Sequence, residues 1–146
     1  MNKRNKIKYK VLEHSADILI EVEGETLGEL FRNAAVGMCN EVLDKNMVEY
    51  DPEWKEGWMD EVNYLSLADN IEDQLKKFLD YIVGVLYIQK TYPKNIIFEE
   101  GSVFTYWERL NSEAVFCDEI KAVTLHMMKI TRGEDGIWRT KVLFDV

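Results

Sequence analysis

Two aspartates near opposite ends of the chain carry the clearest chemical signal in the sequence. Asp17 closes the motif LEHSAD, residues 12–17, and Asp145 lies in the final stretch VLFDV. Each sits at the end of an expected strand, on its more polar parity. The two carboxylates would converge on a hard cation, Ca²⁺ or Mg²⁺, because both metals take oxygen ligands. Val146 would add a backbone oxygen or its α-carboxylate beside Asp145.

A plainer interpretation stands beside the metal hypothesis. Asp17 would cap a turn, and Asp145 would be a solvated charge near the terminus. Spacing alone favours this interpretation, because most aspartates in proteins are exposed. His14 would fix the turn before the strand through a hydrogen bond, a structural role, although an imidazole can also serve as a weak general base.

No complete catalytic set accompanies these residues. The sequence has no glycine-rich phosphate loop, no G-x-S-x-G elbow and no HExxH motif. With only His14 and His126, the chain cannot build a zinc site with several histidines. Cys39 and Cys117 are isolated, and we expect both to be reduced and buried rather than linked or metal-bound. The sequence therefore predicts no catalytic residues.

The net charge of the protein limits the classes of binding partner that we expect. The net charge is −9, from 27 acidic and 18 basic side chains. An acidic surface repels phosphate backbones, so we expect no direct nucleic-acid binding, and a basic protein or a cation suits the charge better. The basic first ten residues precede no apolar signal region, and no apolar run could span a membrane. We expect a cytoplasmic protein.

Hydrophobic periodicity predicts the elements that must position the two aspartates. One amphipathic helix follows the capping box Thr26–Glu29 and ends near Val42, and a second begins after Asp69 or Asn70 and ends near Gln89. Residues 44–60 look mostly like loop. The expected strands, chosen by alternation and bounded by turn residues, are 7–13, 18–24, 62–68, 96–110 with a break near Gly101, 113–120, 122–130 and 137–146.

This order of elements predicts one α+β domain over residues 1–146. Two main helices pack on a largely antiparallel β-sheet, because the helices do not alternate regularly with the strands as in βαβ units. The segments 122–130 and 137–146 flank the turn-rich TRGEDG and are predicted to form a closing hairpin. The sequence does not indicate the oligomeric state.

Three motifs in order resemble the archease family, which provides the protein cofactor of the tRNA-splicing RNA ligase. They are EHSADILI near the start, IKAVTLHMMKI near the end and the terminal FDV. The resemblance spans nearly the whole chain. It implies a protein that is not itself an enzyme. It also implies that the chain promotes guanylylation and multiple turnover of a GTP-dependent ligase, which joins RNA 3′-phosphate and 5′-hydroxyl ends.

The resemblance further implies a metal, usually calcium, bound by Asp17, Asp145 and Val146. Two alternatives remain open. One is a metal-dependent phosphoester hydrolase that uses Asp17, His14 and Asp145, with a bound water as nucleophile. The other is a chaperone-like binding module in which the ion is only structural. Turnover of a phosphoester by the isolated protein would favour the first.

Overall fold

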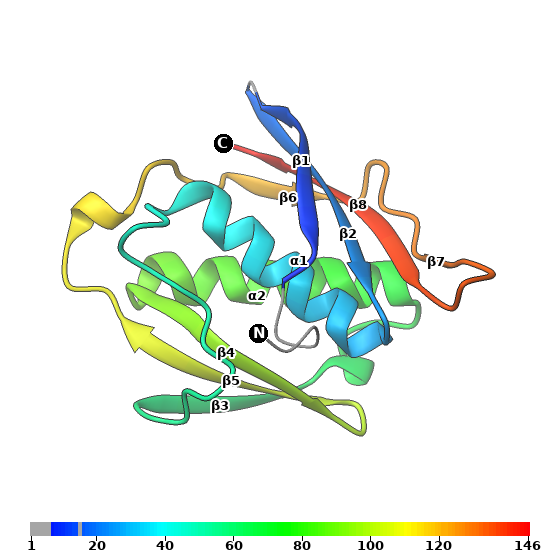
Figure 1. Ribbon diagram of the computed structural model, residues 1–146, viewed down its shortest axis with the longest axis horizontal. Helices are drawn as coiled ribbons and strands as arrows, with labels where there is room; N and C mark the ends of the chain where they lie inside the picture. Colours follow the sequence, from blue (N-terminus) through cyan, green and yellow to red (C-terminus); the bar gives the residue numbers. More distant parts are fainter. Residues whose placement is uncertain (1–6, 15) are drawn as a thin grey trace.

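Two antiparallel sheets enclose two helices in the computed structural model of the protein (Figure 1). The structure describes residues 7–14 and 16–146, with only the backbone of His14, so most of the basic N-terminal stretch lies outside the described residues. The elements are β1 (Tyr9–His14), β2 (Asp17–Gly24), α1 (Leu27–Val42), β3 (Trp58–Asn63), the 3₁₀ helix η2 (Tyr64–Ser66), α2 (Ile71–Ile88), β4 (Thr91–Glu99), β5 (Ser102–Arg109), the 3₁₀ helix η3 (Glu113–Val115), β6 (Ala122–Thr124), β7 (Thr131–Arg132) and β8 (Trp138–Asp145).

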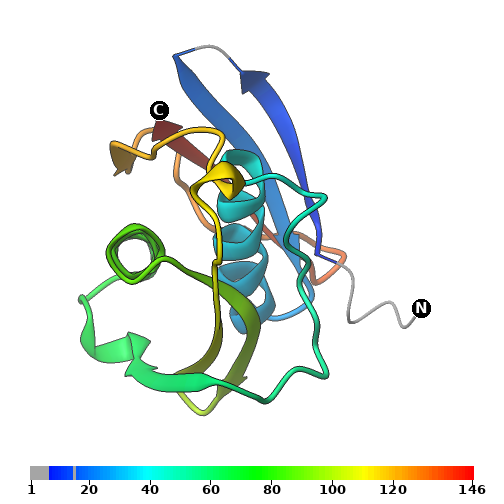
Figure 2. The ribbon, with the colours of Figure 1, turned by 90° about the vertical axis from the view of Figure 1, so that its left-hand side faces the viewer.

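The larger sheet has the strand order β1-β2-β8-β6, with β7 also paired to β8, and the smaller has the order β3-β5-β4. Every pairing is antiparallel. Helix α1 packs against β1, β2 and β8 of one sheet and β4 of the other, and α2 contacts β6 and β4. The turned view in Figure 2 shows the helices between the two sheets. The predicted α+β class is confirmed.

Both long helices begin where the sequence predicts. The Thr26 hydroxyl accepts a hydrogen bond from the Glu29 backbone N–H at 3.1 Å, and the Asn70 side-chain oxygen accepts one from the Asp73 N–H at 2.9 Å. These caps satisfy backbone donors that have no partner inside the helix. The apolar faces of the two helices then meet in the core between the sheets.

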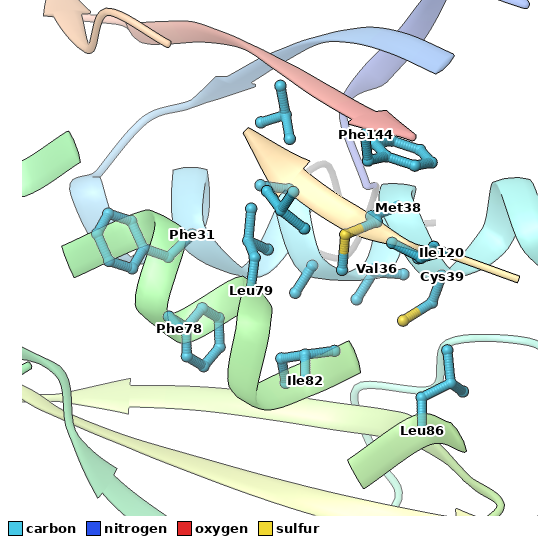
Figure 3. Close-up of a cluster of buried hydrophobic side chains, with 14 of the residues drawn as sticks. Phe31, Val36, Met38, Cys39, Phe78, Leu79, Ile82, Leu86, Ile120 and Phe144 are labelled. Carbon is cyan, nitrogen blue, oxygen red and sulfur yellow. The ribbon is translucent and has the colours of Figure 1, made fainter. Parts of the chain in front are cut away.

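The core is filled from both helices and both sheets. Phe31 of α1 and Phe78 of α2 stack with ring centroids 6.0 Å apart. Phe98 of β4 meets each ring edge-on, at 6.2 and 6.1 Å. Figure 3 shows Phe31 and Phe78 among the buried side chains of the core, with Phe144 of β8 farther along it near Met38. Aromatic packing therefore joins the two helices to each other and to β4 of the smaller sheet.

Three sequence predictions about local structure are wrong in detail. The expected strand 113–120 is the short helix η3 followed by irregular chain, and Cys117 is exposed, whereas Cys39 is buried as expected. Ser112 accepts a hydrogen bond from the Ala114 N–H at 3.1 Å, which favours a turn over an extended backbone here. Only the first two residues of segment 62–68 are extended, in β3.

The predicted closing hairpin is only partly formed. Segment 122–130 contributes β6 over three residues and then turns, with Met127 in the left-handed region at φ +66°. The short strand β7 resumes the pairing with β8. Within the described residues, no helix is both long and apolar enough to cross a membrane.

The aromatic contact between the helices predicts a stability effect. Phe78→Ala should lower the free energy of unfolding by about 3–5 kcal/mol, because the cavity between Phe31 and Phe98 cannot collapse fully. Ile88→Ala on the same helix is the control. Ile88 is 78% exposed, and its truncation should change stability by less than about 0.5 kcal/mol. Urea denaturation of both variants measures the difference, and equal losses would contradict this account of the core.

Candidate functional site

The pairing of β2 with β8 brings the two sequence-predicted aspartates together. The register runs antiparallel without a shift, from Asp17 opposite Asp145 to Gly24 opposite Trp138. Directly opposed residues of antiparallel strands have Cα atoms about 4.5–5.5 Å apart and side chains on the same face. The carboxyl groups of Asp17 and Asp145 are therefore neighbours, although 127 residues separate them in the sequence.

Apolar side chains on both strands fix this register. Ile18 and Ile20 are fully buried, and so are their partners Phe144 and Val142. A slip by one residue would turn these side chains to the opposite face of the sheet. Burial along the strands therefore determines which charged residues face each other at their ends.

The three motifs that carry the family resemblance lie on four adjacent strands of the larger sheet. EHSAD covers the end of β1 and the start of β2, FDV the end of β8, and KAVT includes β6. Ala122 of β6 is the register partner of Asp145 on the side away from Asp17. Stretches that are remote in sequence thus form one corner of the sheet, near the C-terminus in Figure 1.

Backbone hydrogen bonds hold this corner. The Lys121 N–H donates to the carbonyl oxygen of Asp145 at 2.8 Å, and the Val146 N–H donates to the carbonyl oxygen of Ala16 at 3.2 Å. The second bond places Val146 beside the residue that precedes Asp17. The main chain on both sides of the aspartate pair is thus positioned by neighbouring strands, while the Asp17 side chain stays exposed.

The like charges at the corner perturb the titration of Asp17. A hydrogen bond with the Asp145 carboxyl raises the pKa of Asp17 above its ordinary value, and partial desolvation and the negative charges of Asp145 and Glu13 raise it further. A raised carboxyl pKa means that negative charge here is poorly compensated by the protein. A bound cation would supply the missing positive charge, so the donor set fits a hard divalent ion.

The protein alone offers few ligands at this point. Among the side chains that the structure describes, no group of three or more His, Cys, Asp and Glu residues is placed to hold a metal ion. The candidate ligands remain the carboxylates of Asp17 and Asp145 and a backbone oxygen of Val146. Since Ca²⁺ takes about six to eight oxygen ligands, positions would remain for water or for oxygen atoms of another molecule.

Sequence reasoning missed the contribution of Glu13. The β1–β2 register shifts between Val11 and Glu13, so strict alternation along β1 does not give the direction of Glu13. The residue lies in the quoted motif, but only its charge effect on Asp17 reveals its place in the site. The side chain of His14 lies outside the described part of the structure. Its predicted structural role therefore stays a prediction.

Comparison with known proteins identifies the family to which the chain is similar. The model of the Archease protein family matches residues 9–146. An archease from Methanosarcina barkeri is 29% identical, with 95% of this chain and 96% of that protein covered. An archease from Pyrococcus abyssi is 30% identical, with 95% and 99% covered.

Solved structures show the same fold. The crystal structure of an archease from Thermotoga maritima superimposes with a TM-score of 0.63 at 27% identity, covering 94% of this chain and 96% of that one. The solution structure of Methanobacterium thermoautotrophicum protein 1598 gives a TM-score of 0.62 at 24% identity, covering 98% and 99%, which supports the fold alone.

The aspartate pair predicts an unusual dependence of stability on pH in the metal-free protein. The pKa of Asp17 is higher in the folded protein than in the unfolded chain. Protonated Asp17 therefore contributes to the free energy of unfolding at low pH, and this contribution is lost as the pH rises through the folded-state pKa. In a chelating buffer, Asp17→Asn should therefore melt at a higher temperature than the wild type at about pH 7, and the difference should shrink toward about pH 4. Calorimetry over this range measures it.

Asp135 provides a control of opposite sign. Hydrogen bonds with Arg139, one of them 2.7 Å long, lower the pKa of Asp135 to about 2. Its contribution to stability is present above the ordinary carboxyl pKa and is lost as the pH falls through about 2. Asp135→Asn should thus lower the melting temperature at neutral pH. If the two variants shift the melting temperature in the same direction, the proposed repulsion at Asp17 is wrong.

Proposed function

Because this chain belongs to the archease family, we propose that it is a cytoplasmic protein cofactor, not itself an enzyme, that binds a divalent cation and activates an RNA ligase. The cation, calcium or another hard divalent ion, is held by Asp17, Asp145 and Val146. The partner is the GTP-dependent ligase of tRNA splicing and RNA repair, whose guanylylation and multiple turnover the protein promotes.

One observation carries this proposal. The three family motifs meet at one corner of the larger sheet, and there the register sets Asp17 directly opposite Asp145. Buried side chains fix the register, but the Asp17 carboxylate itself is exposed. Two like charges side by side at the surface do not stabilise the fold. The pair instead suits the binding of a cation that is exposed at the surface of the protein.

The incomplete ligand set supports a role in an assembly. Two carboxylates and one backbone oxygen leave part of the coordination shell of a hard cation free. Oxygen atoms of a bound partner could complete that shell. The ion would neutralise the aspartate pair, while the chain itself orients the carboxylates through the β2–β8 register and the backbone bonds at Val146 and Lys121. The overall charge of −9 favours a basic partner surface, which electrostatic attraction would steer into contact.

Asp17 and Asp145 should be required for ligase stimulation but not for folding. In a multiple-turnover ligation assay with the cognate ligase, wild-type protein and calcium should raise the number of turnovers, whereas Asp17→Asn and Asp145→Asn should not. Each variant keeps the size of the side chain and removes one charged ligand. Asp69→Asn, a change at an exposed aspartate before α2, is the matched control and should stimulate as the wild type does.

Calorimetry with and without calcium separates the ion from the fold. A cation that binds only the folded protein should stabilise the wild type by about 2.7 kcal/mol at a hundredfold excess over its dissociation constant. Both site variants should lose this gain. If Asp145→Asn loses it and still stimulates the ligase fully, the ion is structural and the activating surface lies elsewhere. Absence of stimulation by the wild type under every metal and nucleotide condition would refute the cofactor role.

A further inference from the structure

A cleft unrelated to the aspartate pair lies at one end of the smaller sheet. Two neighbouring cross-strand pairs, Trp58–Trp107 and Thr91–Arg109, project from the same face of β3, β5 and β4. Trp107 and Arg109 are two residues apart on the central strand and therefore share that face. Gln89, which caps the C-terminal end of α2, closes the other side. The open cleft has a volume of about 410 Å³, within the usual range for small-ligand sites.

The cleft has a rigid aromatic wall. The rings of Trp58 and Trp107 stack with centroids 5.9 Å apart and planes inclined by 25°. Trp107 is buried, its indole N–H donates to Asp60 at 3.1 Å, and Tyr81 of α2 packs edge-on against it. Trp58 rests on this fixed ring but is 46% exposed, so much of its indole surface is free for a ligand.

The backbone leading into β3 keeps the cleft open. Gly57, which also lines it, has φ +73°, a conformation that favours glycine. A Cβ atom at this position would lie 3.0 Å from the carbonyl oxygen of Trp107. Glycine thus lets the chain pass close to β5 and set Trp58 over Trp107 without filling the space beside them.

Two polar groups that line the cleft lack a bonding partner within the described part of the chain. Thr91 is only 6% exposed. Its hydroxyl oxygen is buried and has no hydrogen-bond partner among the described residues. Buried hydroxyls in native proteins are nearly always bonded, so this one keeps an unused hydrogen-bonding capacity in the wall of the cleft. Its cross-strand neighbour Arg109 forms no ion pair with any carboxylate in the described part of the chain.

We propose that this cleft binds a nucleoside monophosphate, either free or as the phosphate-bearing end of an RNA strand. The base stacks on the exposed indole of Trp58, an interaction open to every base because each has a π face. The phosphate accepts charge-assisted hydrogen bonds from the guanidinium of Arg109. The Thr91 hydroxyl and the Gln89 amide bond to polar atoms of the base or the ribose.

The charge of the cleft selects a single phosphate. Arg109 is the only charged side chain among the described residues that line it, and the carbonyl end of α2 at Gln89 carries partial negative charge. The protein as a whole has a net charge of −9. A triphosphate or a long RNA backbone would bring several charges with no partner. The inference rests on this cleft alone and does not depend on the proposed function at the aspartate pair.

The test is isothermal titration calorimetry of the full-length protein with AMP, adenosine and CMP. AMP should bind more tightly than adenosine, which lacks the phosphate, and more tightly than CMP, whose smaller ring stacks less. Arg109→Gln should weaken AMP binding by about tenfold or more but leave adenosine binding unchanged. Trp58→Ala should weaken both ligands by about fivefold or more.

Thr91→Val separates binding from folding. The substitution keeps the shape of the side chain and removes a hydroxyl that has no hydrogen-bond partner among the residues that the structure describes. The melting temperature should therefore stay the same or rise, while AMP binding weakens by about three- to tenfold. Arg132→Gln is the matched control, because Arg132 lies over Trp138 in the other sheet, 5.7 Å from the ring centroid. It should leave AMP binding unchanged.

An RNA hexamer with a 5′-phosphate distinguishes the two sources of the ligand. If it competes with AMP, and Arg109→Gln abolishes the competition, the cleft takes strand ends; if AMP alone binds, it takes the free nucleotide. Either result supports the site. No binding of AMP or hexamer at millimolar concentration, or binding that Arg109→Gln and Thr91→Val do not affect, would overturn it.

Discussion

The antiparallel pairing of β2 with β8 is the constraint on which the rest of the structure depends. It joins segments near the two ends of the sequence, so nearly the whole chain is a loop that this pairing must close. Loop closure costs conformational entropy, which the buried apolar partners along the two strands offset. The same burial fixes the register to a single alignment. The position of Asp17 opposite Asp145 is therefore a by-product of core packing.

The two helices connect the larger sheet to the smaller one by packing. Helix α1 follows β2 directly and packs on the larger sheet, and α2 stacks on α1 through Phe31 and Phe78. The smaller sheet lies against the opposite side of this pair (Figure 2). Each sheet thus has one face in a shared core and one end that is exposed to solvent. The aspartate pair lies at the exposed end of the larger sheet, and the aromatic cleft lies at the exposed end of the smaller sheet.

The two candidate sites share a physical logic although their chemistry differs. In each, well-packed neighbours hold a polar group whose charge or hydrogen-bonding capacity the described residues do not fully compensate. At the corner of the larger sheet these are like charges that raise the pKa of Asp17, whereas Asp135 shows how an aspartate with an arginine partner behaves. In the cleft the unused group is the buried hydroxyl of Thr91. Such groups are expected where a protein receives a ligand.

The sequence by itself determined the features that depend on local chemistry. The caps at Thr26 and Asn70, the apolar stripes that follow them, and the strand alternation around Ile18 and Ile20 all act over a few residues, so the α+β class could be predicted. The two aspartates could also be chosen as candidates, because each lies at the end of a strand and within a stretch by which the sequence resembles the archease family.

Only the tertiary structure decided which distant segments meet. Strand pairing depends on the summed burial of many residues, so no local pattern showed that Trp58 stacks on Trp107 or that Thr91 lies beside Arg109. Local alternation misled at 113–120, where the Ser112 cap favoured a turn with Val115 buried, and Cys117 is exposed. The register of β1 shifts between Val11 and Glu13, so alternation along the strand did not reveal that Glu13 acts on Asp17. Backbone irregularities break the periodicity from which sequence reasoning infers direction.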